Sequence, residues 1–169
     1  DGVGEGETMS IYTIDDECKI KKIWTNFYPN SVGLFYSTIT DYLGFEINEG
    51  EFKVMSLSSF GKPIYEKEFK KVFDVNNFTI NMDYFEFHKN PSKSFSNKLC
   101  EVFGEPYLNI SEEANFNKYA DIASSAQLIL EYTMKNLIQK AMNLSGKRKI
   151  VLAGGVALNC KMVHSLSKQ

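Results

Sequence analysis

The chain has 169 residues, of which 43% are hydrophobic and 24% are charged, and its formal net charge is −2 at pH 7. This length suffices for one domain with a hydrophobic core, and the weak net charge gives no electrostatic footprint for nucleic acid. No apolar run approaches the ~20 residues that a membrane-spanning helix needs. We therefore expect neither a membrane nor a nucleic acid among the partners.

Cysteine and histidine usage gives a second set of expectations. The three cysteines are odd in number and far apart, and no CxxC motif accompanies them. This pattern predicts reduced thiols, a cytoplasmic setting and no metal site built within the chain. His88 and His164 stand alone, and we expect both at the surface. Because residue 1 is Asp and residues 160–169 have the pattern of an uncapped helix, we interpret residues 1–169 as a single partial domain, truncated at both ends.

The first elements in chain order are a β-hairpin and a helix. The β-prone segments 8–14 and 18–27 flank an acidic turn, and a glycine-rich stretch leads into them. Ser31 then offers an N-cap, and apolar residues at helical spacing follow it as far as residue 43. Gly44 is the expected stop of this helix.

The middle of the chain has weaker patterns. A short helix is expected over 52–60, and a charged helix should begin the segment 65–75. Alternation and aromatic residues predict a strand over 78–87, whereas 94–103 has a weak helical pattern and 104–115 a loop pattern. The expected buried face of the 52–60 helix consists of Phe52, Met55 and Leu57.

The C-terminal part predicts a long helix, a strand and a glycine turn. Apolar and small residues recur at helical spacing over 117–144, and Gly146 ends the pattern. The β-branched run 150–152 has the pattern of a buried parallel strand, which Gly154 and Gly155 follow before a helix start. Glycines at such a turn let backbone approach a nucleotide or phosphate closely. Taken alone, the dipeptide favours an ordinary tight turn between strand and helix, which is the commoner structure.

Three motifs in this order carry a resemblance. They are Asp-Gly-Val-Gly-Glu at 1–5, Glu-Gly-Glu-Phe-Lys-Val-Met at 49–55, and the pair Ala-Asp-Ile-Ala at 120–123 and Gly-Gly-Val-Ala-Leu-Asn at 154–159. Together they resemble the NodU-type carbamoyltransferases, which include nodulation proteins and antibiotic O-carbamoyltransferases. The resemblance implies an α/β fold, the second lobe of an actin/hexokinase/Hsp70-like (ribonuclease H-like) nucleotide-binding domain, with a mixed sheet flanked by helices.

The resemblance also implies site residues near the N-terminus. Residues 1–5 match the second phosphate loop, in which backbone N–H groups meet phosphate oxygens, although a flexible terminus would also explain them. Glu51 is expected to accept ribose hydroxyls and Lys53 to meet a phosphate or carbamoyl oxygen. A carboxylate that complements its helix N-terminus and a solvated lysine are equally good explanations. The phosphate-loop candidates are Asp1, Gly2, Gly4 and Glu5.

The third motif matches the adenosine side of such a site. The resemblance implies that Gly154 and Gly155 flank the nucleotide and that Asn159 forms a hydrogen bond with it. Asp121 and Gln127 match a signature in the long helix, but helix packing or capping explains them equally well, so neither is assigned to the site. No catalytic residue is assigned either, because no residue has the features of a convincing general base.

The implied activity is carbamoyl transfer from carbamoyl phosphate to a hydroxyl of a small-molecule or glycan acceptor, by way of ATP and carbamoyl-adenylate. The resemblance implies a divalent metal, expected to be iron, whose ligands lie outside this chain. It also implies two partners within the same protein, the remaining lobe and an adenylate-forming domain. The 169-residue chain by itself is therefore expected to be inactive.

Two alternatives stay open at this point. The first is another enzyme of the same superfold, such as a tRNA threonylcarbamoyl-transfer enzyme or a kinase-like member. The second is a non-catalytic nucleotide-binding module that kept the fold and lost the chemistry. The Glu-Phe-Lys-Val-Met run favours the carbamoyltransferase branch.

Overall fold

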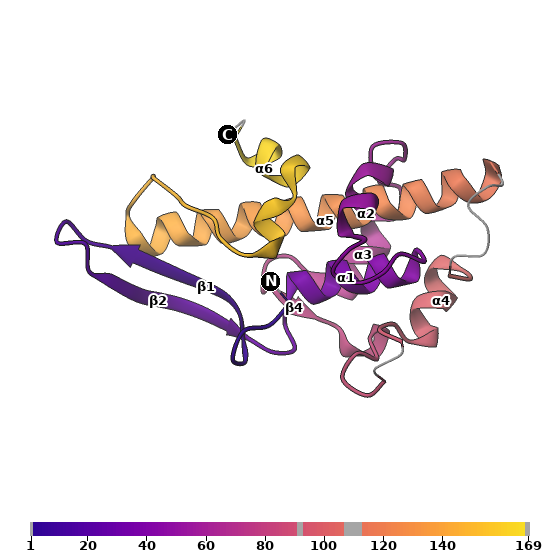
Figure 1. Ribbon diagram of the computed structural model, residues 1–169, viewed down its shortest axis with the longest axis horizontal. Coiled ribbons are helices and arrows are strands. Elements are labelled where there is room, and N and C mark those ends of the chain that lie inside the picture. Colours follow the sequence, from indigo (N-terminus) through magenta and orange to yellow (C-terminus); the bar gives the residue numbers. More distant parts are fainter. Residues whose placement is uncertain (1, 91–92, 107–112, 168–169) are drawn as a thin grey trace.

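The computed structural model describes residues 2–90, 93–106 and 113–167. One long helix, α5, runs along the molecule, and the other elements pack beside it (Figure 1). In chain order the elements are β1 (Glu7–Ile14), β2 (Ile20–Phe27), α1 (Val32–Tyr42), α2 (Glu51–Leu57), α3 (Glu66–Val72), β3 (Phe73–Asp74), β4 (Thr79–Ile80), η1 (Met82–Tyr84), α4 (Asn97–Phe103), α5 (Glu113–Ser145), η2 (Gly155–Leu158) and α6 (Cys160–Ser167).

The predicted N-terminal hairpin is confirmed. β1 and β2 pair antiparallel, with Ile11 opposite Trp24. Ile11 is buried, and the Lys140 ammonium of α5 lies 5.0 Å from the centroid of the Trp24 ring. Lys147, just after α5, donates a hydrogen bond to the Ile14 carbonyl. These contacts hold the hairpin along the C-terminal half of α5 (Figure 1).

Helix α1 begins and ends where the sequence predicts. Ser31 is its N-cap, and the Ser31 hydroxyl accepts a hydrogen bond from the Leu34 N–H at 3.1 Å. The helix buries Phe35 completely, and that ring lies 5.9 Å from Phe69 of α3 and 5.3 Å from Phe73 of β3, measured between ring centroids. The aromatic core therefore joins α1 to the α3–β3 segment, in the layer that packs against α5.

The predicted buried face of the second helix is partly wrong. Val54 and Leu57 of α2 are buried, Met55 is half-buried and Phe52 is 61% exposed. Two residues along an α-helix are separated by about 200° of rotation, so Phe52 lies almost opposite Val54. Because Val54 and Leu57 are the pair that packs inward, Phe52 is directed away from the core.

The link between α2 and α3 is bonded to α5. The Lys62 N–H donates to the Asp121 carboxylate at 2.7 Å, and the Tyr65 N–H donates to the Ser125 hydroxyl at 3.1 Å. Gly61 lies so close to α5 that a β-carbon there would be 2.0 Å from the Ala120 carbonyl oxygen. Packing of this link thus explains Asp121, whose role the sequence left open.

The predicted strand over 78–87 is largely wrong. Only Thr79–Ile80 forms a strand, paired with Phe73–Asp74, and η1 follows closely, while Phe85 makes a single isolated bridge to Phe95. Phe78 adopts a positive φ of 57°, and the Asn81 side chain caps η1 by accepting from the Asp83 N–H at 3.2 Å. These local turns end the extended conformation on both sides of the pair. The predicted helices over 65–75 and 94–103 are confirmed as the shorter α3 and α4.

The predicted long helix is confirmed as α5, which has 33 residues and is followed by Gly146 at φ 68°. The predicted loop 104–115 falls partly outside the described residues, and its last residues belong to α5. The buried parallel strand expected over 150–152 is not formed, and Val151 is 92% exposed. The reason is that the described residues offer it no neighbouring strand, since their strands form only two antiparallel two-stranded sheets and their two isolated bridges lie elsewhere. The α/β class stands, but these residues do not form the expected mixed sheet.

None of the described helices is both long enough and apolar enough to cross a membrane. The three thiols, at Cys18, Cys100 and Cys160, are free, in agreement with the sequence. His88 and His164 are both exposed, as predicted.

Candidate functional site

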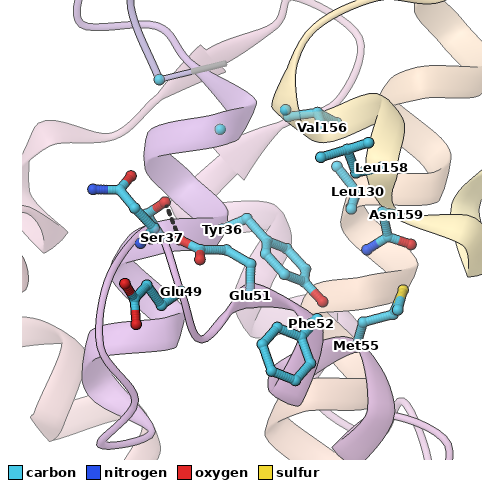
Figure 2. Close-up of a pocket in the computed structure, with 14 residues that line it drawn as sticks. Tyr36, Ser37, Glu49, Glu51, Phe52, Met55, Leu130, Val156, Leu158 and Asn159 are labelled. Carbon is cyan, nitrogen blue, oxygen red and sulfur yellow. Dashed lines mark hydrogen bonds between the residues drawn. The ribbon is translucent and has the colours of Figure 1, made fainter.

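A cavity of about 380 Å³ lies where the N-terminal lead-in, α1, α2 and the 155–159 segment meet (Figure 2). It unites parts of all three motifs, which are separated by up to about 150 residues in the chain. Its lining consists of Gly2, Gly33, Tyr36, Ser37, Asn48, Glu49, Glu51, Phe52, Met55, Leu130, Gly155, Val156, Leu158 and Asn159.

The predicted site residues divide into two groups. Four of them, Gly2, Glu51, Gly155 and Asn159, line the cavity. Those that do not line it are Gly4, Glu5, Lys53 and Gly154, and Asp1 lies outside the described residues.

In the N-terminal loop that leads into β1, two backbone amides form hydrogen bonds within the loop itself. The Gly4 N–H donates to the Glu7 carbonyl at 2.8 Å, and the Glu7 N–H donates back to the Gly4 carbonyl at 2.9 Å. This tight turn occupies the Gly4 amide that the resemblance assigned to phosphate. Gly2 is thus the described residue of the loop that borders the cavity.

Lys53 is exposed on the outer side of α2. Its ammonium lies 5.8 Å from the ring centroid of Phe45 and 5.9 Å from that of Phe52. Such cation–π contacts at the surface stabilise by about 0.5–1 kcal/mol. In this arrangement Lys53 matches the solvated lysine that the sequence also allowed.

Glu51 stands in the first turn of α2 with its carboxylate beside α1. One carboxylate oxygen, Oε1, accepts from the Ser37 hydroxyl at 2.7 Å and from the Asn48 N–H at 3.1 Å. Figure 2 shows the Ser37 bond at the edge of the cavity. Glu51 therefore complements the helix N-terminus and lines the cavity as well. Within the described part of the chain, Oε2 has no hydrogen-bond partner, so it can accept from a ligand hydroxyl.

Asn159 belongs to a network of side chains at the inner end of the cavity. Its Nδ2 donates to Gln127 Oε1 at 2.9 Å, and its Oδ1 accepts from Gln127 Nε2 at 3.0 Å. The Tyr36 hydroxyl donates to the same Gln127 Oε1 at 2.9 Å, and Gln127 Nε2 also donates to Glu131 at 3.0 Å. Oδ1 of Asn159 further caps α6 by accepting from the Met162 N–H at 2.9 Å.

Burial fixes the protonation state of Tyr36. Desolvation raises the pKa of this phenol well above its ordinary value, and the nearby Asn159 amide acts in the opposite direction. Tyr36 therefore remains protonated at neutral pH and donates its proton to Gln127.

Sequence reasoning missed Tyr36 and left Gln127 unassigned. Gln127 carries one usable signal, because a long polar amide interrupts the apolar face that includes Ala126 and Leu130 of the long helix. A polar side chain on a buried face must find hydrogen-bond partners. Tyr36 carries no comparable signal, since a tyrosine on a helix face is common in hydrophobic cores.

The charge of the lining limits what the cavity can hold. Its described residues include the carboxylates of Glu49 and Glu51 and no lysine or arginine. Gly33 lies in the first turn of α1, and no residue of that turn is acidic, so the helix presents the positive end of its dipole at the cavity wall. Phe52 and Leu158 supply apolar surface at the rim (Figure 2). The cavity thus suits a flat apolar ring and hydroxyl groups, with negative charge tolerated only beside α1.

The described residues of the lining include no histidine, cysteine or lysine. Across the described residues, no group of three or more histidine, cysteine or acidic side chains is placed to hold a metal ion. Among the described lining residues, the Glu49 and Glu51 carboxylates are therefore the groups that could accept a proton.

Comparison with known proteins identifies the family. The family model described as the carbamoyltransferase N-terminus matches residues 1–169. An uncharacterised Synechocystis protein is 34% identical over 95% of this chain and 26% of its own length, and one from Methanocaldococcus jannaschii is 33% identical over 100% and 31%. Nodulation protein NolO of Bradyrhizobium diazoefficiens is 28% identical over 79% of this chain and 22% of its own length. The chain thus spans about a quarter of the length of these relatives, and it belongs to the carbamoyltransferase N-terminal family, as its resemblance to the NodU-type enzymes predicted.

Proposed function

We propose that the full-length protein is a carbamoyltransferase. It would transfer a carbamoyl group from carbamoyl phosphate, by way of ATP and carbamoyl-adenylate, to a hydroxyl of a small-molecule or glycan acceptor. The family match supports carbamoyl transfer in general. The observation that carries the nucleotide part is the convergence of Gly2, Glu51, Gly155 and Asn159 on one cavity.

In this proposal the cavity holds the nucleoside portion of ATP. The adenine ring lies against the apolar side chains that include Phe52 and Leu158, and the free carboxylate oxygen of Glu51 accepts a ribose hydroxyl. The phosphates lie away from the two carboxylates, towards Gly33 at the N-terminus of α1 and the adjacent Gly2. The charge distribution of the lining supports this direction, because a triphosphate over Glu49 and Glu51 would be repelled.

The chemistry divides into two steps. In the first, water converts carbamoyl phosphate into carbamate and phosphate, and a carbamate oxygen then attacks the α-phosphorus of ATP, so that carbamoyl-adenylate forms and pyrophosphate leaves. The acceptor oxygen then attacks the carbamoyl carbon, its proton passes to a base, and AMP leaves. The described residues would bind and orient the adenylate, and the base and the adenylate-forming domain would come from other parts of the protein.

The proposal also includes the fold of the domain, a metal ion and the cellular compartment. The domain would be the second lobe of an actin/Hsp70-like fold and would close its cleft against the other lobe. A divalent metal, expected to be iron, would polarise the carbamoyl oxygen when bound, with ligands beyond the described residues. Three free thiols support a cytoplasmic setting.

The first test is Asn159→Ala in the full-length protein. We expect its affinity for ATP to fall about tenfold, because removing one hydrogen-bonding partner in a desolvated site costs about 1–3 kcal/mol. Isothermal titration calorimetry with ATP measures the change. Asn143→Ala is the matched control, since Asn143 is exposed near the end of α5 and bonds only to Gln139 among the described residues. Equal ATP affinity in the Asn159 variant and the wild type would rule out this assignment.

A turnover assay separates the proposal from its two alternatives. Pyrophosphate release that requires carbamoyl phosphate supports the carbamoyltransferase. ATP consumption without carbamoyl phosphate would instead indicate a kinase-like enzyme, and ATP binding without any turnover would indicate a non-catalytic module. The isolated 169-residue chain is expected to show no transfer, so transfer by that chain would contradict the assignment of the base to another part of the protein.

A further inference from the structure

The amide of Gln127 has all four of its hydrogen-bonding positions occupied. Its Oε1 accepts from Tyr36 and from Asn159, and its Nε2 donates to Glu131 and to Asn159, at distances between 2.9 and 3.0 Å. The Gln127 side chain is buried on α5, with 1% of its surface exposed. The Tyr36 hydroxyl could donate or accept, but the Glu131 carboxylate only accepts, so exchanging the Gln127 oxygen and nitrogen would set acceptor against acceptor there, and the observed orientation is the stable one.

The orientation of Gln127 determines that of Asn159. Asn159 Oδ1 faces Gln127 Nε2 and also accepts from the Met162 N–H, so both of its lone-pair positions are used. Its Nδ2 faces Gln127 Oε1. Any hydrogen bond from Asn159 to a molecule in the cavity must therefore come from Nδ2, as a donor.

We propose that Gln127 is a positioning residue, held by the Glu131 carboxylate and the Tyr36 hydroxyl, which orients the Asn159 amide as a hydrogen-bond donor towards the ligand. The identity of the ligand as an adenine nucleotide rests on the function proposed above. The atom of the ligand that meets Asn159 must then be an acceptor, such as a ring nitrogen or a hydroxyl oxygen. The site discriminates against a molecule that presents a donor at that point, because two N–H groups would face each other.

A purely architectural role is the alternative, in which Gln127 only joins α5 to α6. The two roles differ in one respect. A positioning residue acts through Asn159, so its loss should have no further effect on binding once Asn159 is gone. An architectural residue would lower affinity by the same factor with or without Asn159.

The experiment uses the full-length protein with Gln127→Met, which keeps the length of the side chain and removes its amide. Tyr36→Phe removes only the hydroxyl and serves as a second variant in case the first does not fold. Thr133→Val is the matched control, because it removes a buried hydroxyl of α5 that bonds to Ile129 outside the network. ATP affinity is measured by calorimetry for each variant, alone and combined with Asn159→Ala.

We expect Gln127→Met and Tyr36→Phe to weaken ATP binding by about tenfold and about threefold alone, and neither to weaken it further in the Asn159→Ala background. Thr133→Val should bind as the wild type does. Equal loss in both backgrounds would overturn the proposal. Asn159→Asp, which lacks both side-chain N–H donors, should bind ATP at least as weakly as Asn159→Ala, and wild-type affinity in this variant would overturn the donor assignment.

A second readout does not depend on the ligand. If Gln127 orients Asn159, the Met162 amide that Asn159 caps should exchange its hydrogen several-fold faster in Gln127→Met and at the wild-type rate in Thr133→Val. Unchanged exchange in Gln127→Met would overturn the positioning role. Faster exchange in a protein that binds no ATP would support the positioning role while the proposed function fails, so the two failures are distinguishable.

Discussion

Gly61→Ala is expected to lower the free energy of unfolding by about 3 kcal/mol, at the upper end of what an added methyl group costs in a packed interior. A β-carbon at Gly61 would lie 2.0 Å from the Ala120 carbonyl oxygen and 2.5 Å from the Asp121 amide nitrogen. Both are backbone atoms of α5, which cannot rotate away as the end of a side chain can. The link between α2 and α3 must therefore move off α5, which also breaks the bond between the Lys62 N–H and Asp121.

The same displacement should reach the cavity. Helix α2 carries Glu51, Phe52 and Met55, and the link after it holds the helix against α5. Urea denaturation of the full-length protein, with hydrogen exchange of the α2 and α5 peptides as a local readout, measures the effect. Gly4→Ala is the control, because a β-carbon there has no atom within 4 Å. Wild-type stability in the Gly61 variant would contradict the close approach of the two segments.

Phe35→Ala is expected to cost about 3–5 kcal/mol, the range measured when a large buried aromatic side chain is truncated. Phe35 has no exposed surface and forms aromatic contacts with Phe69 and Phe73. Its removal would leave a cavity between α1 and the α3–β3 segment. The next residue in α1 is Tyr36, so the loss of packing should also loosen the Tyr36–Gln127 bond.

Phe52→Ala is the matched control for this variant. It removes the same side chain from a site that is 61% exposed, so we expect a loss of stability below about 1 kcal/mol. For ligand binding the order should be reversed. Phe52→Ala removes a side chain that lines the cavity, whereas Phe35→Ala removes no contact with a bound ligand. Equal unfolding midpoints for the two variants in urea would show that Phe35 is not a core residue.

The sequence predicts best those elements whose signals are local. The Ser31 cap, the hairpin and the long helix before Gly146 each depend on residues that are close in the chain, and all three are confirmed. The strands expected over 78–87 and 150–152 fail for a different reason. A strand needs a partner, and an apolar run in the sequence does not reveal whether one is present.

The candidate site divides in the same way. The ordered motifs predicted that Gly2, Glu51, Gly155 and Asn159 belong to one site, and the structure places all four on one cavity, although their binding roles stay predictions. The partners of Asn159 could not be read from the sequence. The network depends on how α1, α5 and the start of α6 meet, which is a tertiary property without a local signal.

The segment 150–152 also bears on how the isolated 169-residue chain behaves at high concentration. Ile150 and Val151 are exposed β-branched residues that belong to no strand of the described chain, and such a segment is a template for intermolecular strand pairing, the first step of β-aggregation. Three consecutive cations, Lys147, Arg148 and Lys149, come directly before it. They act as gatekeepers, because bringing two copies of the segment together would place like charges side by side. The three cations thus oppose intermolecular strand pairing at the segment that directly follows them.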